Sequence, residues 1–168
     1  MHPDLQKRFD SLEARRQALV ERVRALADPM QRQKPPSGGF SALEVVMHFA
    51  KAEDSNNGFL RKAPPPTLKN RRITYGIFYR PTLASLQNPG KPVGAPPMFV
   101  PKGQFTLADA DGAWAAARKD LAAYLEQVES PEDPFIKFLF IFGTLSAADY
   151  LEFTEAHMHY HEVRFPAA

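Results

Sequence analysis

The chain has 168 residues, of which 44% are hydrophobic and 24% are charged, a globular composition that excludes the disordered and fibrous classes. Its length suits one domain spanning residues 1–168. The 21 basic and 19 acidic residues leave a net charge of +2, which does not indicate nucleic acid as a partner. Because the chain has no cysteine, disulfides and thiolate ligands are excluded, and a metal ion would need histidine, carboxylate or carbonyl ligands.

The sequence predicts neither a signal peptide nor a membrane span. Residues 1–8 run directly into a charged helical pattern. The longest uncharged apolar run, at 138–142, is far shorter than the roughly 20 residues that cross a bilayer. We therefore expect a cytoplasmic protein with no membrane partner.

The first predicted helix begins near the N-terminus and ends near Ala27. Its leucines recur every seven residues from Leu5 to Leu26, which is the spacing of an amphipathic helix. The pair Asp28-Pro29 predicts its end, because the residue before a proline avoids the helical conformation. Arg16 interrupts the apolar seam and favours a bundle helix over a coiled coil. Residues 31–40 are then expected to form a loop.

Three more helices are predicted from capping boxes, in which a serine or threonine precedes an acid by three residues. The boxes are Ser41 with Glu44, Thr106 with Asp109, and Ser146 with Asp149. The predicted helices run from these boxes to about residue 60, to residues 130–131, and to Pro166, respectively. Trp114 belongs to the expected buried stripe of the second of these helices.

A proline-rich stretch separates the second and third predicted helices, since nine of the 16 prolines lie between Pro64 and Pro101. Proline disrupts a helix interior, so we expect a long crossover connection or a lid, with a short helical segment at 82–86. Residues 134–143 are interpreted as a dense apolar connection, because no stretch shows the alternation of a strand. The predicted fold is an all-α four-helix bundle.

Four of the five histidines fall in two of these helices. His157 and His161 are four residues apart, so they share one helix face and can converge on one ion. His159 is turned by about 200° from His157 and should point away. His48 lies among apolar positions of the second helix. The competing interpretations are a hydrogen-bonded pair for His157 and His161, and for His48 a core histidine that donates to a carbonyl.

Three neutral imidazoles from two helices would leave at least one coordination position of a divalent ion open, which is typical of a catalytic site. Glu53, Asp54 and Glu155 are available as a general base, but each is interpreted as a solvated helix residue, so the catalytic residue stays unassigned. Glu44 is needed by its capping box. The basic cluster at 69–72 is interpreted as a solvated loop, and nucleic acid is not expected as a partner.

The motifs Gly39-Phe40-Ser41-x-x-Glu44-x-x-x-His48, Phe142-Gly143-Thr144-Leu145-Ser146 and His157-x-x-x-His161 resemble the DinB-like (DinB/YfiT) metalloenzyme superfamily. This resemblance implies a four-helix bundle with crossover topology, often dimeric, whose divalent metal ion is held by His48, His157 and His161. Zinc and nickel are the first choices for the metal, ahead of iron.

Characterised relatives include transferases and isomerases that use small thiols. The resemblance therefore implies a homodimeric enzyme that activates water or a thiol for a small-molecule substrate, as a hydrolase or a thiol-dependent transferase. The alternative is a non-catalytic bundle that serves as a binding module with the metal site vacant.

Two positions depart from the pattern of this family. Many relatives have a histidine directly before the last ligand, where this chain has Tyr160, and a glutamine three residues after it, where this chain has Arg164. The positive charge of arginine would repel a nearby dication unless it points to solvent or pairs with Glu155 or Glu162. We interpret Arg164 as a residue suited to the C-terminal end of the helix dipole, with contact to an anionic substrate as the alternative.

Overall fold

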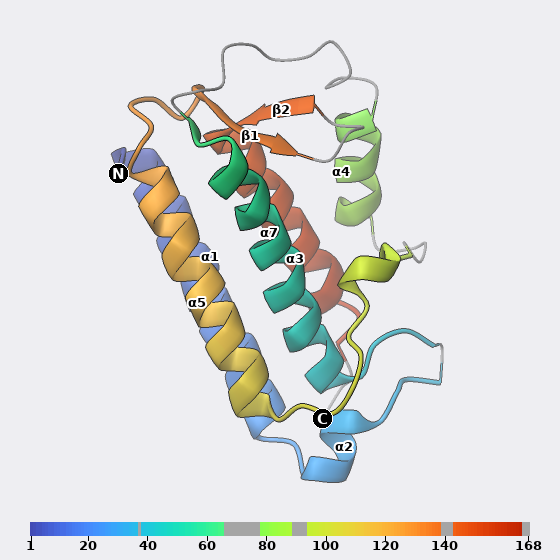
Figure 1. The fold of residues 1–168 in the computed structure, drawn as a ribbon. Helices are drawn as coiled ribbons and strands as arrows, with labels where there is room; N and C mark the ends of the chain where they lie inside the picture. The colour runs from blue at the N-terminus through green and yellow to red at the C-terminus, as the bar shows by residue number, and fades with distance from the viewer. Residues whose placement is uncertain (37, 66–77, 89–93, 139–142, 166–168) are drawn as a thin grey trace.

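Four long helices form a bundle in the computed structural model, which describes residues 1–36, 38–65, 78–88, 94–138 and 143–165 (Figure 1). In chain order these helices are α1 (Pro3–Arg24), α3 (Ala42–Lys62), α5 (Leu107–Leu125) and α7 (Ala147–Glu162). The predicted all-α four-helix bundle is confirmed. No helix within the described ranges combines the length and the apolarity that a bilayer crossing requires.

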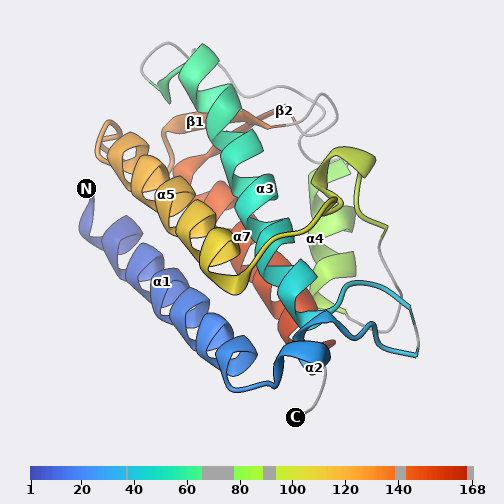
Figure 2. The same ribbon diagram turned by 60° about the horizontal axis from the view of Figure 1, so that its bottom comes forward.

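The two middle helices run in the same direction. Figures 1 and 2 show α3 and α5 side by side and parallel, with α1 and α7 running the opposite way. Parallel neighbours cannot be joined by a short turn, so the chain must return along the length of the bundle. The proline-rich stretch makes this predicted crossover, although its residues 66–77 and 89–93, and with them the basic cluster at 69–72, lie outside the described residues.

Two short helices lie within the crossover, α4 (Arg80–Gln87) and the 3-10 helix η3 (Pro97–Phe99). Helix α4 contains the predicted segment at 82–86 and packs on α7, with Leu83 and Leu86 buried. The hydroxyl of Tyr79, just before α4, donates to the carbonyl of Asp149 at 2.8 Å. The crossover is therefore fastened to the bundle on the side of α7.

The end of the first helix differs from the prediction. Helix α1 ends at Arg24, three residues before Ala27, and a short helix, α2 (Asp28–Arg32), follows directly. Pro29 lies in the first turn of α2, where the missing N–H of proline has no partner to lose. The Asp28-Pro29 pair therefore begins a helix as well as ending one, and part of the loop expected at 31–40 is helical.

All three predicted capping boxes are present, and each begins its helix where expected. The helix ends were predicted less well. Helix α5 ends at Leu125, before the predicted 130–131, because the carboxylate of Asp133 accepts the backbone N–H groups of Glu129 at 3.0 Å and Ser130 at 2.8 Å and closes a tight turn there. Helix α7 ends at Glu162, and Pro166 lies outside the described residues.

The prediction of a dense apolar connection at 134–143 is wrong, because the described residues of this stretch belong to two paired strands. Strand β1 (Pro134–Phe138) pairs antiparallel with β2 (Gly143–Ser146), and Ile136 lies opposite Leu145. Every residue of β2 is buried, as are Phe135 and Ile136. A strand that is covered on both faces lacks the alternation of polar and apolar residues that marks a strand in the sequence. Residues 139–142 lie outside the described residues.

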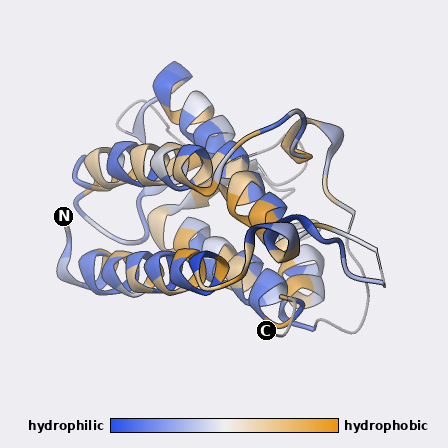
Figure 3. Ribbon diagram, turned by 90° about the horizontal axis from the view of Figure 1, so that it is seen from below, coloured by the Kyte–Doolittle hydropathy of each residue, from blue (hydrophilic) through white to orange (hydrophobic). Residues whose placement is uncertain are grey.

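The core lies between the four helices. Leu5, Leu12 and Leu19 of the predicted seam are buried in α1, whereas Leu26 is only partly buried, and Trp114 is fully buried. Each long helix carries both hydrophilic and hydrophobic segments, as Figure 3 shows. Arg16, which interrupts the seam, is buried as well, and its guanidinium pairs with the carboxylates of Glu13 and Asp111.

Candidate metal site

Helices α3 and α7 bring three histidines together. His48 comes from α3, and His157 and His161 come from adjacent turns of α7. One ring nitrogen of each lies within 4.8 Å of the other two, and we call this group the three-histidine cluster. His159 is exposed on another face of α7, as predicted.

His48 is oriented by the crossover. Its Nδ1 lies 2.9 Å from the carbonyl oxygen of Phe99 in η3. Because a carbonyl can only accept, Nδ1 carries the proton, and the lone pair of Nε2 is left to face the cluster. His48 is thus the core histidine that donates to a carbonyl, as one interpretation of the sequence held, and the same bond prepares its other nitrogen for a ligand role.

The spacing of the ring nitrogens suits a metal ion. The Nε2 atoms of His48 and His157 are 3.1 Å apart. A tetrahedral zinc ion with Zn–N bonds of about 2.0–2.1 Å holds its ligand nitrogens about 3.3 Å apart. Imidazole nitrogens are ligands for zinc, nickel and iron alike. The residues of the cluster therefore fit a divalent ion, and their chemistry does not select one metal among these.

Burial keeps the cluster neutral. It lowers the pKa of His48, although the hydrogen bond to Phe99 opposes part of this effect. Burial lowers the pKa of His157 well below the usual value, and the positive charges that His161 and His48 would carry lower it further. Burial, with His48 and Arg164, lowers the pKa of His161 to about 3. Near pH 7 all three imidazoles are neutral, the state that binds a metal.

Aromatic rings surround the cluster. The ring of Phe49 lies 5.0 Å from that of His157, between centroids, and stacks on the indole of Trp114 at 4.7 Å, so the cluster rests on the bundle core. Phe40 lies 4.9 Å from His48, and Phe153 lies 6.0 Å from His157. Phe49 is buried, whereas Phe40 and Phe153 are partly exposed. These two rings form partly exposed apolar walls beside the cluster.

One acid was misread from the sequence. Glu53, expected to be solvated, is 4% exposed and forms an ion pair with Arg118, itself 2% exposed, with Oε2 and Nε 2.7 Å apart. Its place four residues after Phe49 and seven before Leu60, on the apolar stripe of α3, was a signal that it would be buried. The pair ties α3 to α5 beneath the cluster.

The other acids considered as a general base have partners elsewhere. Glu155 is bound by Arg8, Asp54 is paired with Arg61, and Glu44 completes its capping box as predicted. Within the part of the chain that the structure describes, no carboxylate joins the three histidines as a ligand group.

Arg164 lies beside the cluster at the end of α7. Its Cζ is 3.9 Å from the ring centroid of Tyr160, and the Tyr160 ring lies 5.1 Å from that of His161. The two acids named as possible partners of Arg164, Glu155 and Glu162, form ion pairs with Arg8 and Arg15.

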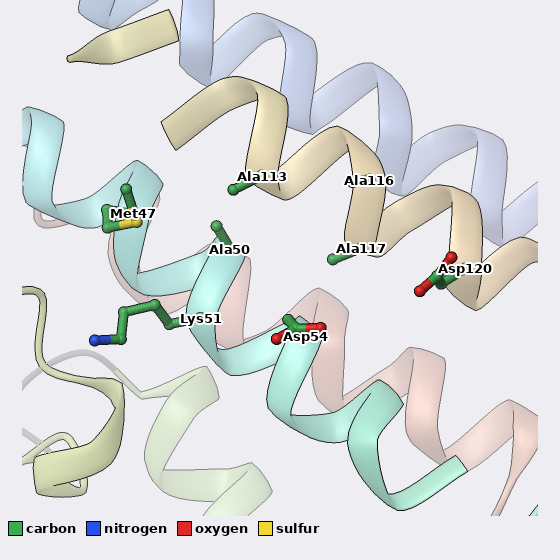
Figure 4. Close-up of a pocket in the computed structure, with 8 residues that line it drawn as sticks. All are labelled: Met47, Ala50, Lys51, Asp54, Ala113, Ala116, Ala117 and Asp120. Carbon is green, nitrogen blue, oxygen red and sulfur yellow. The ribbon is translucent and has the colours of Figure 1, made fainter. Parts of the chain in front are cut away.

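A shallow groove lies apart from the histidines, on the outer face of α3 and α5 (Figure 4). Small side chains such as Ala50, Ala113 and Ala117 line it, with Asp54 and Asp120 at one end. No ligand-type side chain of the cluster borders it, and the groove carries no chemistry that we assign.

Comparison with known proteins agrees with the geometry. The family model of the DinB superfamily matches residues 11–162, a range that contains all three histidines. Searches of curated proteins and of solved structures found no match.

Proposed function

The chain belongs to the DinB superfamily, and we propose that it is a metal-dependent enzyme whose divalent ion is held by His48, His157 and His161. The observation that carries the proposal is that Nε2 of His48, whose proton is held on Nδ1 by Phe99, lies 3.1 Å from Nε2 of His157 in a neutral site. Without an ion, a proton would have to lie between them. We propose further that residues 1–168 form one such domain.

Each residue of the site has a role in this proposal. An ion held there would act as a Lewis acid toward water or a thiol. The carbonyl of Phe99 keeps the proton of His48 on Nδ1, so that Nε2 stays a ligand. Phe49 is buried and would exclude water from the inner side of the site, while Phe40 and Phe153 are partly exposed beside it. The reaction class is hydrolysis or thiol transfer on a small molecule, and zinc or nickel is the expected metal, ahead of iron. A homodimer stays a prediction.

Metal analysis tests this proposal. We expect freshly purified protein to contain about one equivalent of a divalent metal, and His48→Ala, His157→Ala and His161→Ala to lose it, because a tetrahedral site that loses one of three protein ligands binds weakly. His159→Ala is the matched control, since His159 is exposed on the same helix and should retain full metal content. Circular dichroism establishes that each variant is folded. Full metal retention in all three cluster variants would refute the assignment.

A non-catalytic binding module is the second candidate. The ion pairs of α3 and α7 favour it. Glu53, Asp54 and Glu155, the acids considered as a general base, are all engaged in ion pairs with arginines. A vacant module predicts a melting temperature that does not change with a chelator. The metalloenzyme predicts a lower melting temperature after chelation, because an ion that binds the folded state stabilises it.

A further inference from the structure

One short segment of the crossover is attached to the helix that carries His48. We call residues 97–100, which are η3 and the residue after it, the η3 segment. Two side-chain hydrogen bonds attach it to α3. Nδ1 of His48 donates to the carbonyl of Phe99 at 2.9 Å, and Nζ of Lys51 donates to the carbonyl of Val100 at 3.3 Å. Adjacent carbonyls of the segment are therefore held by neighbouring turns of one helix face.

The bond from His48 is the more deeply buried of the two. His48 is 2% exposed and Phe99 is 8% exposed, whereas Lys51 is partly exposed. A hydrogen bond shielded from water is electrostatically stronger than one in water. Breaking it would also leave a buried N–H group without an acceptor, which costs more than the loss of an exposed bond. The docking of the η3 segment on α3 therefore depends mainly on His48.

His48 connects the segment to the three-histidine cluster through one aromatic ring. Its Nδ1 donates to Phe99, and its Nε2 lies 3.1 Å from Nε2 of His157. A divalent ion bound at Nε2 withdraws electron density from the imidazole, so the N–H group at Nδ1 becomes a stronger donor. A hydrogen bond with a positively charged donor is roughly twice as strong as a neutral one. The ion would thus strengthen the bond that docks the segment.

Metal binding and docking are linked thermodynamically. If the docked segment raises the affinity of the site for a metal ion, the bound ion must favour the docked segment by the same factor. Groups that accept the second N–H of a metal-bound histidine typically change metal affinity by about 10–100-fold. The docking equilibrium of the segment should therefore change by up to about 10–100-fold when the metal binds.

Helix α4, which belongs to the same crossover, is attached to the bundle by other contacts. Its Leu83 and Leu86 are buried where it packs on α7. The hydroxyl of Tyr79, just before α4, donates to the carbonyl of Asp149 in the first turn of α7. These contacts involve no histidine of the cluster. Helix α4 therefore serves as an internal reference for effects of the metal on the η3 segment.

On the basis of the metal centre proposed above, we propose that a bound divalent ion stabilises the η3 segment on α3, so that this part of the crossover responds to the occupancy of the metal site. His48 is the positioning residue that couples the two. Its imidazole binds the ion on one side and holds the carbonyl of Phe99 on the other. Without the ion the segment opens more often, while α4 stays docked on α7.

Hydrogen exchange followed by mass spectrometry tests this coupling. The amides of Phe99 and Val100 report on the segment, since they are bonded within its single turn and one turn does not persist without tertiary contacts. The wild type is compared after treatment with a chelator and after addition of zinc. We expect zinc to slow exchange at these two amides by up to about 10–100-fold and to slow exchange in α4 clearly less.

Two variants separate metal binding from docking. His161→Ala removes one proposed ligand and keeps the bond between His48 and Phe99, so zinc should leave exchange in its η3 segment unchanged. His157→Ala should behave in the same way and gives a second test if one variant fails to fold. His159→Ala is the matched control, because His159 is exposed on the same helix and the variant should respond to zinc like the wild type.

Zinc content, measured in the same samples, keeps this inference apart from the metal proposal. A wild-type protein that takes up no zinc overturns the proposed function and this inference with it. A zinc-loaded wild type in which exchange of Phe99 and Val100 is unchanged, or slows no more than that of α4, overturns the inference alone. Slower exchange of these amides in His161→Ala that holds no zinc also overturns it, because the effect of zinc would then not come from the cluster.

Discussion

At the scale of single residues, the stability of the fold depends on the buried ion pair between Glu53 and Arg118. Both side chains are nearly inaccessible, and burial raises the pKa of Glu53 while the charge of Arg118 opposes that rise. A buried ion in such a place is tolerable with its partner and costly without it.

Arg118→Met should therefore lower the free energy of unfolding by about 3–5 kcal/mol, because it leaves the Glu53 carboxylate buried without its counter-ion. Urea denaturation followed by circular dichroism measures the loss. Arg61→Met, which removes the half-exposed partner of Asp54, is the control and should cost about 0–1 kcal/mol. The double variant Glu53→Leu with Arg118→Met should recover much of the loss, and equal losses in the single and double variants would contradict this account.

The cluster also predicts how stability depends on pH. The pKa of His161 is about 3 in the folded protein, against an unperturbed value of about 6.5. Between these values the unfolded chain binds a proton that the folded protein does not, so the metal-free protein should lose stability as the pH falls from about 6.5 toward 3.

Urea denaturation of chelator-treated protein at several pH values measures this slope. His161→Gln should reduce it, because the variant removes one group that takes up a proton on unfolding. His159→Gln, on the exposed face of α7, is the control and should leave the slope near that of the wild type. An unchanged slope in His161→Gln would contradict the burial-based explanation.

At the scale of elements, two adjacent carbonyls of the crossover bind side chains of α3, and one of these side chains is His48 of the three-histidine cluster. Phe99 accepts from His48 at 2.9 Å, and Val100 accepts from Nζ of Lys51 at 3.3 Å, one turn further along α3. Lys51 thereby holds the segment that orients His48, although Lys51 belongs to neither the cluster nor its aromatic walls.

Lys51→Met should lower metal affinity by up to about tenfold, the lower end of the roughly 10–100-fold that direct partners of metal ligands contribute, because Lys51 acts on His48 only through the Phe99–Val100 segment. Competition with a chromophoric chelator measures the affinity. Lys119→Met, at an exposed position on α5, is the control and should leave metal affinity unchanged. If Lys51→Met binds metal like the wild type, the contact with Val100 does not support the site.

The beginnings of elements were more predictable than their ends. A capping box is local, since the hydroxyl of Ser146 and the carboxylate of Asp149 satisfy backbone groups within one turn, and the sequence shows both. The end of α5 depends on Asp133, which reaches back from the following turn, and the hairpin depends on what covers it. Contacts of this kind leave no periodic pattern in the local sequence, so they could not be predicted from it.

At the scale of the whole molecule, the sequence could predict which histidines share a face but not that the two faces meet. The spacing of His157 and His161 follows from the helix repeat. Their approach to His48, 109 positions earlier, depends on how α3 and α7 pack, and only the resemblance to a family supplied it. The burial of Glu53 could be predicted from its position on the apolar stripe of α3. Its ion pair with Arg118 could not, because that pair depends on how α3 and α5 pack.

The separation of the three histidines along the chain determines when the proposed metal site could form during biosynthesis. Chain growth at about 5–20 residues per second places roughly 5–20 s between the emergence of His48 and that of His157, which lies 109 positions later. During that interval a nascent polypeptide presents a single imidazole, which cannot retain an ion against competing cellular chelators. In the proposed metalloenzyme, a metal ion would therefore bind only after α7 has left the ribosome and packed against α3, so metal content would indicate completed folding.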